Sequence, residues 1–157
     1  YAPLFAHVEG WQWRPDLIWY DNLRSFRTAS WHVQQMYSEY KGERVLKTVS
    51  DGTPLCGAEG QDGLFASAVL DGDKVYVKIV NTTPDEQSIS LKFNGLKRKQ
   101  KIEAEKRVNL HSYDLYEDNS LDDPDAFEPY TEGFDFSDGS VAAEPYSFSI
   151  YCFRLVR

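Results

Sequence analysis

Most of the tryptophan in this chain lies in one short stretch, which is the first place to look for binding chemistry. The segment WQWRPDLIWYD, residues 11–21, holds three of the four tryptophans, and the fourth is Trp31. Pro15 interrupts regular structure inside the segment, so we expect a loop. Large aromatic rings in a loop are either packed into a core or arranged around a ligand. Both interpretations stay open at this point.

Acid–base and metal chemistry have few other candidates. His7, His32 and His111 have neither metal-ligand spacing nor a matched Ser or Cys nucleophile, so each is interpreted as structural. Residues 117–138 are strongly acidic, but they lack the D-x-D-x-D-G spacing of a calcium loop. We therefore favour a solvated loop over a calcium site, and we expect neither a metal nor a cofactor.

The bulk properties exclude several partner classes. The chain has 157 residues, enough for one domain or one domain with an appendage, and a net charge of −8. That charge argues against binding to nucleic acid and to anionic membranes. No apolar run approaches the roughly 18 residues of a membrane span, and no signal peptide is visible. The first residue is Tyr1, so we expect a processed product or an excised piece. Cys56 and Cys152 form either one disulfide or two free thiols.

The first 42 residues have the pattern of a strand, a loop and a helix. Residues 1–8 are apolar apart from His7, which is typical of a short buried strand. Thr28 and Ser30 are candidate N-caps, and Lys41 and Gly42 suit a helix C-terminus. The apolar stripe of this helix consists of Val33, Met36, Tyr37 and Tyr40. One such βα unit normally belongs to a larger α/β sheet or barrel.

After Gly42 the pattern changes to strands. Residues 64–70 and 74–80 flank Asp71-Gly72-Asp73 and predict a hairpin. Residues 88–93 alternate cleanly, whereas residues 101–116 alternate less cleanly. The segment 146–156 shifts its apolar parity, which indicates a bulge or burial on both faces. The basic run at residues 97–101 is interpreted as a solvated turn and edge strand. These strands predict an all-β sandwich or jelly roll.

Several stretches, in this order, resemble a known family. APLF at residues 2–5 resembles its final barrel strand, W-x-P-D-x-I-x-Y-D at residues 13–21 the loop that follows, and SWHVQQMY at residues 30–37 its last barrel helix. DGLFASAVLDGDKVYVKIVN at residues 62–81 and NSLDDPDAFEP at residues 119–129 resemble its C-terminal β-sandwich, including an N-S-x-x-x-P-x-x-x-x-P pattern. The family is that of the α-L-arabinofuranosidases of glycoside hydrolase family 51.

The resemblance implies a mainly β fold, an antiparallel β-sandwich or jelly roll preceded by a strand-loop-helix segment left over from a (β/α)₈ barrel. Residues 1–42 would be the terminal βα unit and residues 43–157 the C-terminal domain. The family is retaining and uses two glutamates on earlier barrel strands, which would precede Tyr1. No acidic residue here matches either, so the fragment has no catalytic residue and should be inactive. Glu9 follows a barrel-like strand, but a single carboxylate cannot perform the double displacement.

For the tryptophan segment, the resemblance implies a place at the barrel mouth. Trp11, Gln12 and Trp13 would line the substrate there, with Arg14 and Asp16 adding charge and hydrogen bonds. The alternative is that the rings pack between barrel and sandwich, which we favour for any one tryptophan. Trp19 and Trp31 lean further towards packing. Asp16 and Asp21 are expected to make loop hydrogen bonds. An isolated fragment would expose aromatic surface and could self-associate.

Three functions remain in competition. The first is the accessory C-terminal domain of a retaining α-L-arabinofuranosidase, whose partners are its own upstream barrel and, through that barrel, arabinan or arabinoxylan. Such a parent is compatible with secretion or a periplasmic location. The second is a non-catalytic carbohydrate-binding module, for which the candidate rings Tyr113, Tyr116 and Tyr130 have no organised spacing. The third is a purely structural domain.

Overall fold

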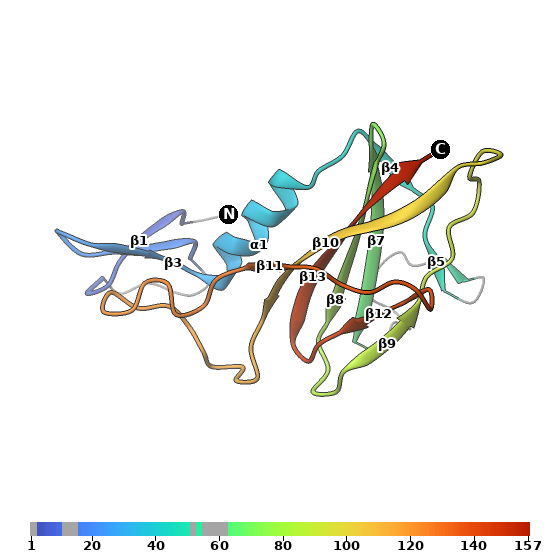
Figure 1. Ribbon diagram of the computed structural model, residues 1–157. Coiled ribbons are helices and arrows are strands. Elements are labelled where there is room, and N and C mark those ends of the chain that lie inside the picture. Colours follow the sequence, from blue (N-terminus) through green and yellow to red (C-terminus); the bar gives the residue numbers. More distant parts are fainter. Residues whose placement is uncertain (1–2, 11–15, 51–52, 55–62) are drawn as a thin grey trace. The chain divides into compact units, whose positions relative to one another are not determined.

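The computed structural model describes residues 3–10, 16–50, 53–54 and 63–157. Within these ranges the chain contains one helix and 13 strands (Figure 1). They form two compact units, each built from two separate parts of the chain. The N-terminal unit comprises residues 1–39 and 114–129, and the sheet unit comprises residues 40–113 and 130–157. In the described part of the chain, α1 is too short and too polar to cross a membrane.

The N-terminal unit begins with three short strands, β1 (Phe5–His7), β2 (Ile18–Tyr20) and β3 (Ser25–Arg27), in the order β1-β2-β3. β1 runs parallel to β2, and β2 runs antiparallel to β3. The predicted first strand is therefore present, but the expectation that it is buried is wrong for this chain. Ala6 is buried, whereas Leu4 and Phe5 are 47% and 56% exposed. The reason is that β1 lies at the edge of its sheet.

The predicted helix is confirmed as α1 (Ala29–Glu39). Thr28 precedes it and Oγ1 of Thr28 accepts a 3.4 Å hydrogen bond from the N–H of Trp31, as an N-cap does. Its fully buried residues are His32 and Met36, not the whole predicted stripe, and Tyr37 is 42% exposed. The helix also ends earlier than expected. Lys41 and Gly42 therefore lie beyond its last turn.

The sheet unit is organised around six antiparallel strands in the order β11-β10-β13-β8-β7-β4. In chain order these are β4 (Arg44–Leu46), β7 (Leu64–Asp71), β8 (Lys74–Asn81), β10 (Lys101–His111), β11 (Tyr130–Glu132) and β13 (Ser147–Val156). Two further pairs are β5 (Val49–Ser50) with β6 (Thr53–Pro54), and β9 (Gln87–Ser90) with β12 (Ser140–Ala143). Pairing of Asp71 with Lys74 across Gly72-Asp73 confirms the predicted hairpin.

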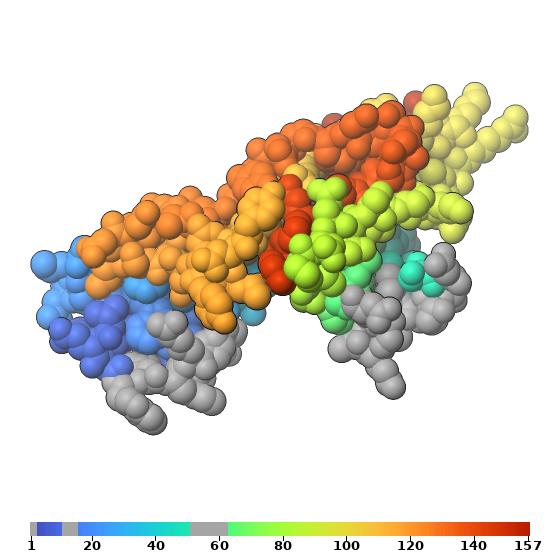
Figure 2. All heavy atoms as spheres, turned by 90° about the horizontal axis from the view of Figure 1, so that it is seen from below, coloured from blue at the N-terminus to red at the C-terminus, as the bar shows by residue number. Residues whose placement is uncertain are grey.

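The main core lies between the six-stranded sheet and the β9–β12 pair. Val77 and Phe153 from the sheet pack with Val141 and Ala143 from β12. Figure 2 shows the β9 segment (yellow-green) and the β12 segment (orange-red) side by side on the surface of the sheet unit. Phe93 and Phe136 pack edge-on against Phe153, with ring centroids 5.0 and 4.9 Å away. This is a sandwich with one large and one small layer; the jelly-roll connections stay a prediction.

β13 is buried on both faces, which is one of the two alternatives that the shift in its apolar parity left open. Tyr151 and Phe153 face the main core, and Ile150 and Cys152, also buried, face the other side. The bulge lies in the neighbouring strand, where the register of β10 shifts between Ala104 and Lys106. One extra residue reverses the alternation of side chains along a strand. This reversal explains why residues 101–116 alternate less cleanly than the other strands.

Two features of the structure disfavour a side chain at Gly42: its positive φ and the close approach of Val69. Its φ is +66°, and a Cβ there would lie 2.8 Å from Cβ of Val69. Gly95 has a similar φ of +83° but open space around it. Alanine at Gly95 should lower the free energy of unfolding by about 1 kcal/mol through backbone strain alone. Alanine at Gly42 should lower it by about 2–4 kcal/mol, because the clash adds to that strain.

Urea denaturation of the two variants, followed by far-ultraviolet circular dichroism, measures this difference. Equal losses for Gly42→Ala and Gly95→Ala would show that the approach of Val69 does not constrain the chain.

Candidate functional site

The side chain of Asn119 joins the two parts of the N-terminal unit. Its Nδ2 donates hydrogen bonds to the backbone carbonyls of Arg27 (2.9 Å) and Phe127 (3.0 Å), and its Oδ1 accepts one from the N–H of Phe127 (2.6 Å). The residue is 4% exposed. Ser120 closes the start of the same loop, because its Oγ and its N–H both bond to the backbone of Asp123. The N-S-x-x-x-P pattern thus has a physical basis.

Two arginines of the N-terminal unit pair with the acidic run. Arg24 forms ion pairs with Asp122 at 2.8 Å and with Asp21 at 3.2 Å. Arg27 is 3.1 Å from both Asp125 and Glu128, and its guanidinium lies 5.0 Å from the ring centre of Trp31. The side chains are largely exposed, so each pair stabilises the unit only slightly. These carboxylates fix a loop against β3, and among the described residues none belongs to a metal-type cluster.

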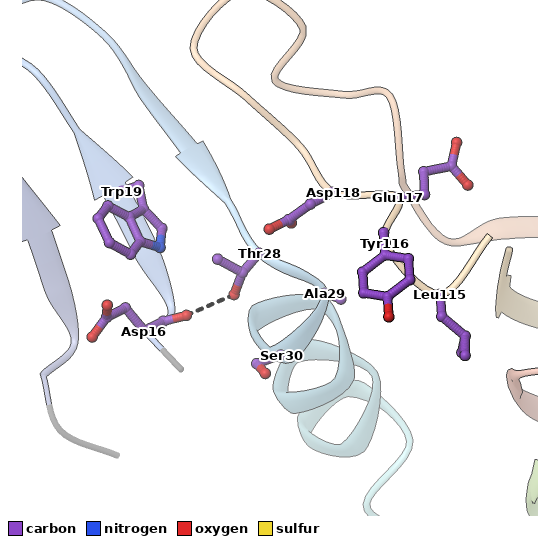
Figure 3. A pocket seen from close by; sticks show the side chains of 9 residues that line it. All are labelled: Asp16, Trp19, Thr28, Ala29, Ser30, Leu115, Tyr116, Glu117 and Asp118. Carbon is purple, nitrogen blue, oxygen red and sulfur yellow. Dashed lines mark hydrogen bonds between the residues drawn. The ribbon is translucent and has the colours of Figure 1, made fainter. Parts of the chain in front are cut away.

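A pocket of about 290 Å³ lies at the N-terminus of α1 within this unit (Figure 3). One wall is formed by Asp16, Trp19 and the residues that begin the helix. The other is formed by residues 115–118, where Tyr116 is 92% exposed and stands at the rim. The lining combines an indole, a phenol, hydroxyls and carboxylates. Such a surface can stack on a sugar ring and exchange hydrogen bonds with its hydroxyls.

Asp16 and His32 are the buried polar residues of this unit whose side chains are unsatisfied. Oγ1 of Thr28 bonds to the backbone carbonyl of Asp16 (2.8 Å), but both carboxylate oxygens of Asp16 have no partner among the described residues. The two ring nitrogens of His32 likewise form no well-aligned hydrogen bond with a described residue, although the Gln35 side chain acts on the ring and partly offsets the lowering of its pKa. Burial, and then the positive charge of Arg27, lower the pKa of His32. His32 therefore stays neutral down to lower pH than an exposed histidine.

The residues that the sequence placed at the substrate, Trp11, Gln12 and Trp13, lie outside the described residues. Their role stays a prediction. Glu9 is exposed, and its N–H donates a 3.2 Å hydrogen bond to Nδ1 of His7, which agrees with a structural role for that histidine.

The expected loop hydrogen bonds are confirmed for Asp21. Its Oδ1 accepts from the N–H groups of Leu23 (2.7 Å) and Arg24 (2.6 Å). These two bonds lower the pKa of Asp21. The Asp16 side chain makes no such bond in the described structure.

The sheet unit holds a second polar cluster, around Asn109 and Glu144. Asn109 is fully buried and donates to Glu144 and, at 2.8 Å, to Oη of Tyr130, while its Oδ1 accepts from Ser149 at 2.7 Å. The other oxygen of Glu144 is 3.1 Å from Arg107. These groups satisfy one another across β10, β11, β13 and the turn before β13, so we assign them a structural role.

One of the two cysteines, Cys152, lies in the described part of the chain. Cys152 has a free thiol, and burial raises its pKa to about 11, which makes it a poor nucleophile. Cys56 lies outside the described residues.

Comparison with known proteins gives a consistent result. The family model described as the α-L-arabinofuranosidase C-terminal domain matches residues 1–147. α-L-Arabinofuranosidase 1 of Arabidopsis thaliana is 25% identical over 96% of this chain, which spans 22% of that relative's length. The extracellular exo-α-L-arabinofuranosidase of Streptomyces chartreusis is 35% identical over 48% of this chain and 10% of its own length.

Solved structures show the same fold. An arabinose-bound α-L-arabinofuranosidase of glycoside hydrolase family 51 superposes with a TM-score of 0.78, covering 99% of this chain and 24% of the other at 22% identity. The thermostable enzyme from Thermotoga petrophila RKU-1 gives a TM-score of 0.68, covering 87% of this chain and 31% of the other at 17% identity. This chain thus spans about a quarter to a third of these structures.

Asn119→Ala should lower the free energy of unfolding of the N-terminal unit by about 2–3 kcal/mol, because it leaves buried backbone groups of Arg27 and Phe127 unpaired. All four tryptophans lie in residues 11–31, so tryptophan fluorescence during urea denaturation reports on this unit. Asn94→Ala, in an exposed loop of the sheet unit, is the control and should change little. An unchanged midpoint for Asn119→Ala would contradict the assigned role.

Neutral His32 should make the N-terminal unit sensitive to mild acid. Its folded pKa lies below the unfolded value of about 6.5. Its contribution is therefore complete above pH 6.5 and is lost as the pH falls towards the folded pKa. His32→Phe removes the titrating group, so the variant should lose less stability between pH 7 and pH 5. The same fluorescence-detected denaturation measures both proteins, and identical pH profiles would rule out His32 as the source.

Proposed function

Because this chain belongs to the α-L-arabinofuranosidase C-terminal domain family, we propose that it is the C-terminal part of a retaining family 51 enzyme. That enzyme hydrolyses terminal α-L-arabinofuranosyl residues of arabinan or arabinoxylan. Residues 1–42 supply the last βα unit of its (β/α)₈ barrel, and residues 43–157 supply the adjoining sandwich. Its partner is the upstream barrel of the same polypeptide, and its substrate is reached through that barrel.

The exposed apolar side chains of β1 carry the proposal. Leu4, Phe5 and Val8, which lie in or directly beside β1, are 37% to 56% exposed, and in the described sheet β1 pairs with one neighbour, β2. In a closed parallel barrel every strand has two neighbours and its side chains are covered on both sides. A preceding barrel strand beside β1 would cover this surface. α1 follows β3 in the chain, as the helix of a βα unit would.

The proposed division of labour follows from the chemistry of retaining hydrolysis. Two carboxyl groups about 5–5.5 Å apart act as nucleophile and acid/base, and they belong at the C-terminal mouth of a barrel. We assign both to the upstream strands. The segment after β1 would reach the same mouth, where Trp11, Gln12 and Trp13 would line the arabinofuranose site. The chain by itself should be inactive.

The coding DNA upstream of the Tyr1 codon tests this proposal. We expect an open reading frame with repeated βα units and two glutamates at strand ends. A stop codon directly upstream would overturn it. So would turnover of p-nitrophenyl α-L-arabinofuranoside by the purified 157-residue chain, provided that the activity stays with the chain through successive columns.

In the full-length enzyme, Phe5→Lys should lower kcat/KM by about tenfold or more. A buried lysine at this position would separate β1 from the neighbouring strand and displace the loop that follows. Val45→Lys is the matched control, because Val45 is 79% exposed on β4, an edge strand of the six-stranded sheet. Equal kinetics for both variants would place β1 outside the barrel.

A carbohydrate-binding module is the second candidate, favoured by the exposure of Tyr113 (80%) and Tyr116 (92%). Exposed rings are what such modules use to stack on sugars. Isothermal titration with arabino-oligosaccharides separates the two functions. Binding by the 157-residue chain that is lost in Tyr113→Ala or Tyr116→Ala would favour the module.

A further inference from the structure

The connection between β9 and β10 carries the densest positive charge in the chain. From Gln87 to Ile102 there are five Lys and Arg residues and no Asp or Glu, although the whole chain has 25 acidic and 17 basic residues. Four of the five form a cluster that we call the basic turn: Lys97, Arg98, Lys99 and Lys101. Such segregation places a cationic spot on an acidic protein.

All four side chains of the basic turn are exposed. Of the ion pairs formed between described residues, none uses them. Arg24, Arg27 and Arg154 each pair with a carboxylate of the chain, whereas the exposed Lys41, Arg44 and Lys47 form no ion pair with a described residue either; the basic turn differs from these in that its charges are clustered. The charges of the basic turn are therefore available to a ligand from outside.

The backbone holds these charges in a defined arrangement. The N–H of Gln100 donates to the carbonyl of Lys97 at 2.8 Å, and Oε1 of Gln100 accepts from the N–H of Lys97 at 3.1 Å. Lys99 has a φ of +71°. The third position of a turn with positive φ favours glycine or asparagine. Lysine at this position therefore has a conformational cost, which is compatible with a role for its side chain.

The basic turn projects from the sheet unit, at the tip of the yellow connection in Figures 1 and 2. Lys101 begins β10 and pairs with Val156 on one side, whereas β11 pairs with β10 only from Arg107 to Asn109. The other edge of β10 is thus open beside the turn. A long ligand can therefore reach the basic turn along this edge without a clash with a neighbouring strand. The earlier interpretation, a solvated turn that protects an edge strand, accounts for the lysines at the edge but not for the strained Lys99.

We propose that the basic turn binds an anionic polysaccharide, one whose sugars carry carboxylates at intervals along the chain. The choice of a polysaccharide among polyanions rests on the proposed function, because a polymer with an acidic backbone and neutral arabinose side chains would be held by the turn and cleaved elsewhere. Binding consists of ion pairs between the basic turn and uronate carboxylates.

The charge density of nucleic acids and anionic membranes makes them less suitable ligands for the basic turn than a polysaccharide. A DNA duplex carries one charge per about 1.7 Å over a long rigid rod, and a charged bilayer is an extended surface. Either would meet the rest of a molecule whose net charge is −8. The field of the basic turn reaches only about 10 Å at 0.1 M salt. A flexible polymer with sparser charge can contact the turn alone.

Affinity electrophoresis and isothermal titration with polygalacturonate at 50 mM NaCl test the proposal on the 157-residue chain. The variant carries Lys97→Gln, Arg98→Gln, Lys99→Gln and Lys101→Gln. Each exposed ion pair is worth a factor of roughly 1.4 to 5, so we expect binding to weaken by about tenfold or more. Wild-type binding should also weaken at 500 mM NaCl, because salt screens exposed pairs.

The matched control removes four charges away from the basic turn, with Arg24→Gln, Lys41→Gln, Arg44→Gln and Lys47→Gln, all at exposed positions. It changes the net charge by the same amount and should bind within about twofold of the wild type. If both variants lost the same affinity for polygalacturonate, net charge alone would explain the loss, and the basic turn would not be the binding site. Tighter binding of the wild type to duplex DNA, to polyglutamate or to anionic vesicles would overturn the choice of polysaccharide.

Lys99→Gly separates binding from folding. Glycine relieves the positive φ, so the Tm should rise by about 2 °C, while binding should weaken about two- to fivefold. Unchanged binding in this more stable variant would argue against Lys99 as a contact. The binding test and the test of the proposed function can fail separately. If the chain binds polygalacturonate but no barrel is encoded upstream, only the proposed enzyme is refuted. If the full-length enzyme is active but does not bind polygalacturonate, only the basic-turn site is refuted.

Discussion

The N-terminal unit depends on one buried amide, the side chain of Asn119. Residues 1–39 and 114–129 are far apart in the sequence, and ordering both costs conformational entropy that local contacts must offset. A neutral amide suits this joint, because it donates to the backbone of Arg27 and exchanges bonds with Phe127 without burying a charge. The ion pairs of Arg24 and Arg27 surround it but are exposed, so they add little.

The sequence predicted the longer strands of the sheet unit, because half-buried strands leave a period of two in the chain. It did not predict the short strands β4, β5, β6, β11 and β12, whose two to four residues are too few to show an alternation. It located the β7–β8 hairpin, and for β13 it left a bulge and burial on both faces as alternatives, of which the structure shows the second. It could not place the bulge, because a reversal of parity in β10 looks the same as irregular burial until the partner strand is known. The prediction that β1 is buried was wrong, because an apolar sequence does not show whether the elements that would cover the strand are present in the same chain. The predicted division into residues 1–42 and 43–157 stays a prediction. The two compact units are defined by packing within this chain, and packing does not show which residues would belong to a barrel.

The candidate site was less predictable than the fold. The resemblance pointed to the pattern that begins at Asn119, but it could not name Arg27 as the partner, because no local periodicity links positions so far apart. The acidic run was expected to be a solvated loop. That prediction is wrong for part of the run, because Asn119 is buried, Phe134 and Phe136 pack against the main core, and residues 130–132 form β11. The carboxylates of residues 122–128 are exposed, yet several pair with arginines that the sequence analysis left unassigned. His32 was counted as polar and therefore omitted from the buried face of α1, where it lies one turn before Met36.

The two units differ in how well they satisfy their buried polar groups, and this difference bears on function. In the sheet unit, Asn81 and Asn109 each make three or more hydrogen bonds, and Nε2 of His111 is the buried side-chain atom left over among its described residues. In the N-terminal unit, both oxygens of Asp16 and both ring nitrogens of His32 lack partners in the described structure. Native proteins rarely leave such groups unpaired. The same unit exposes Phe5 on a one-sided strand. The exposed apolar side chains of this unit agree with the proposal that an upstream barrel adjoins β1.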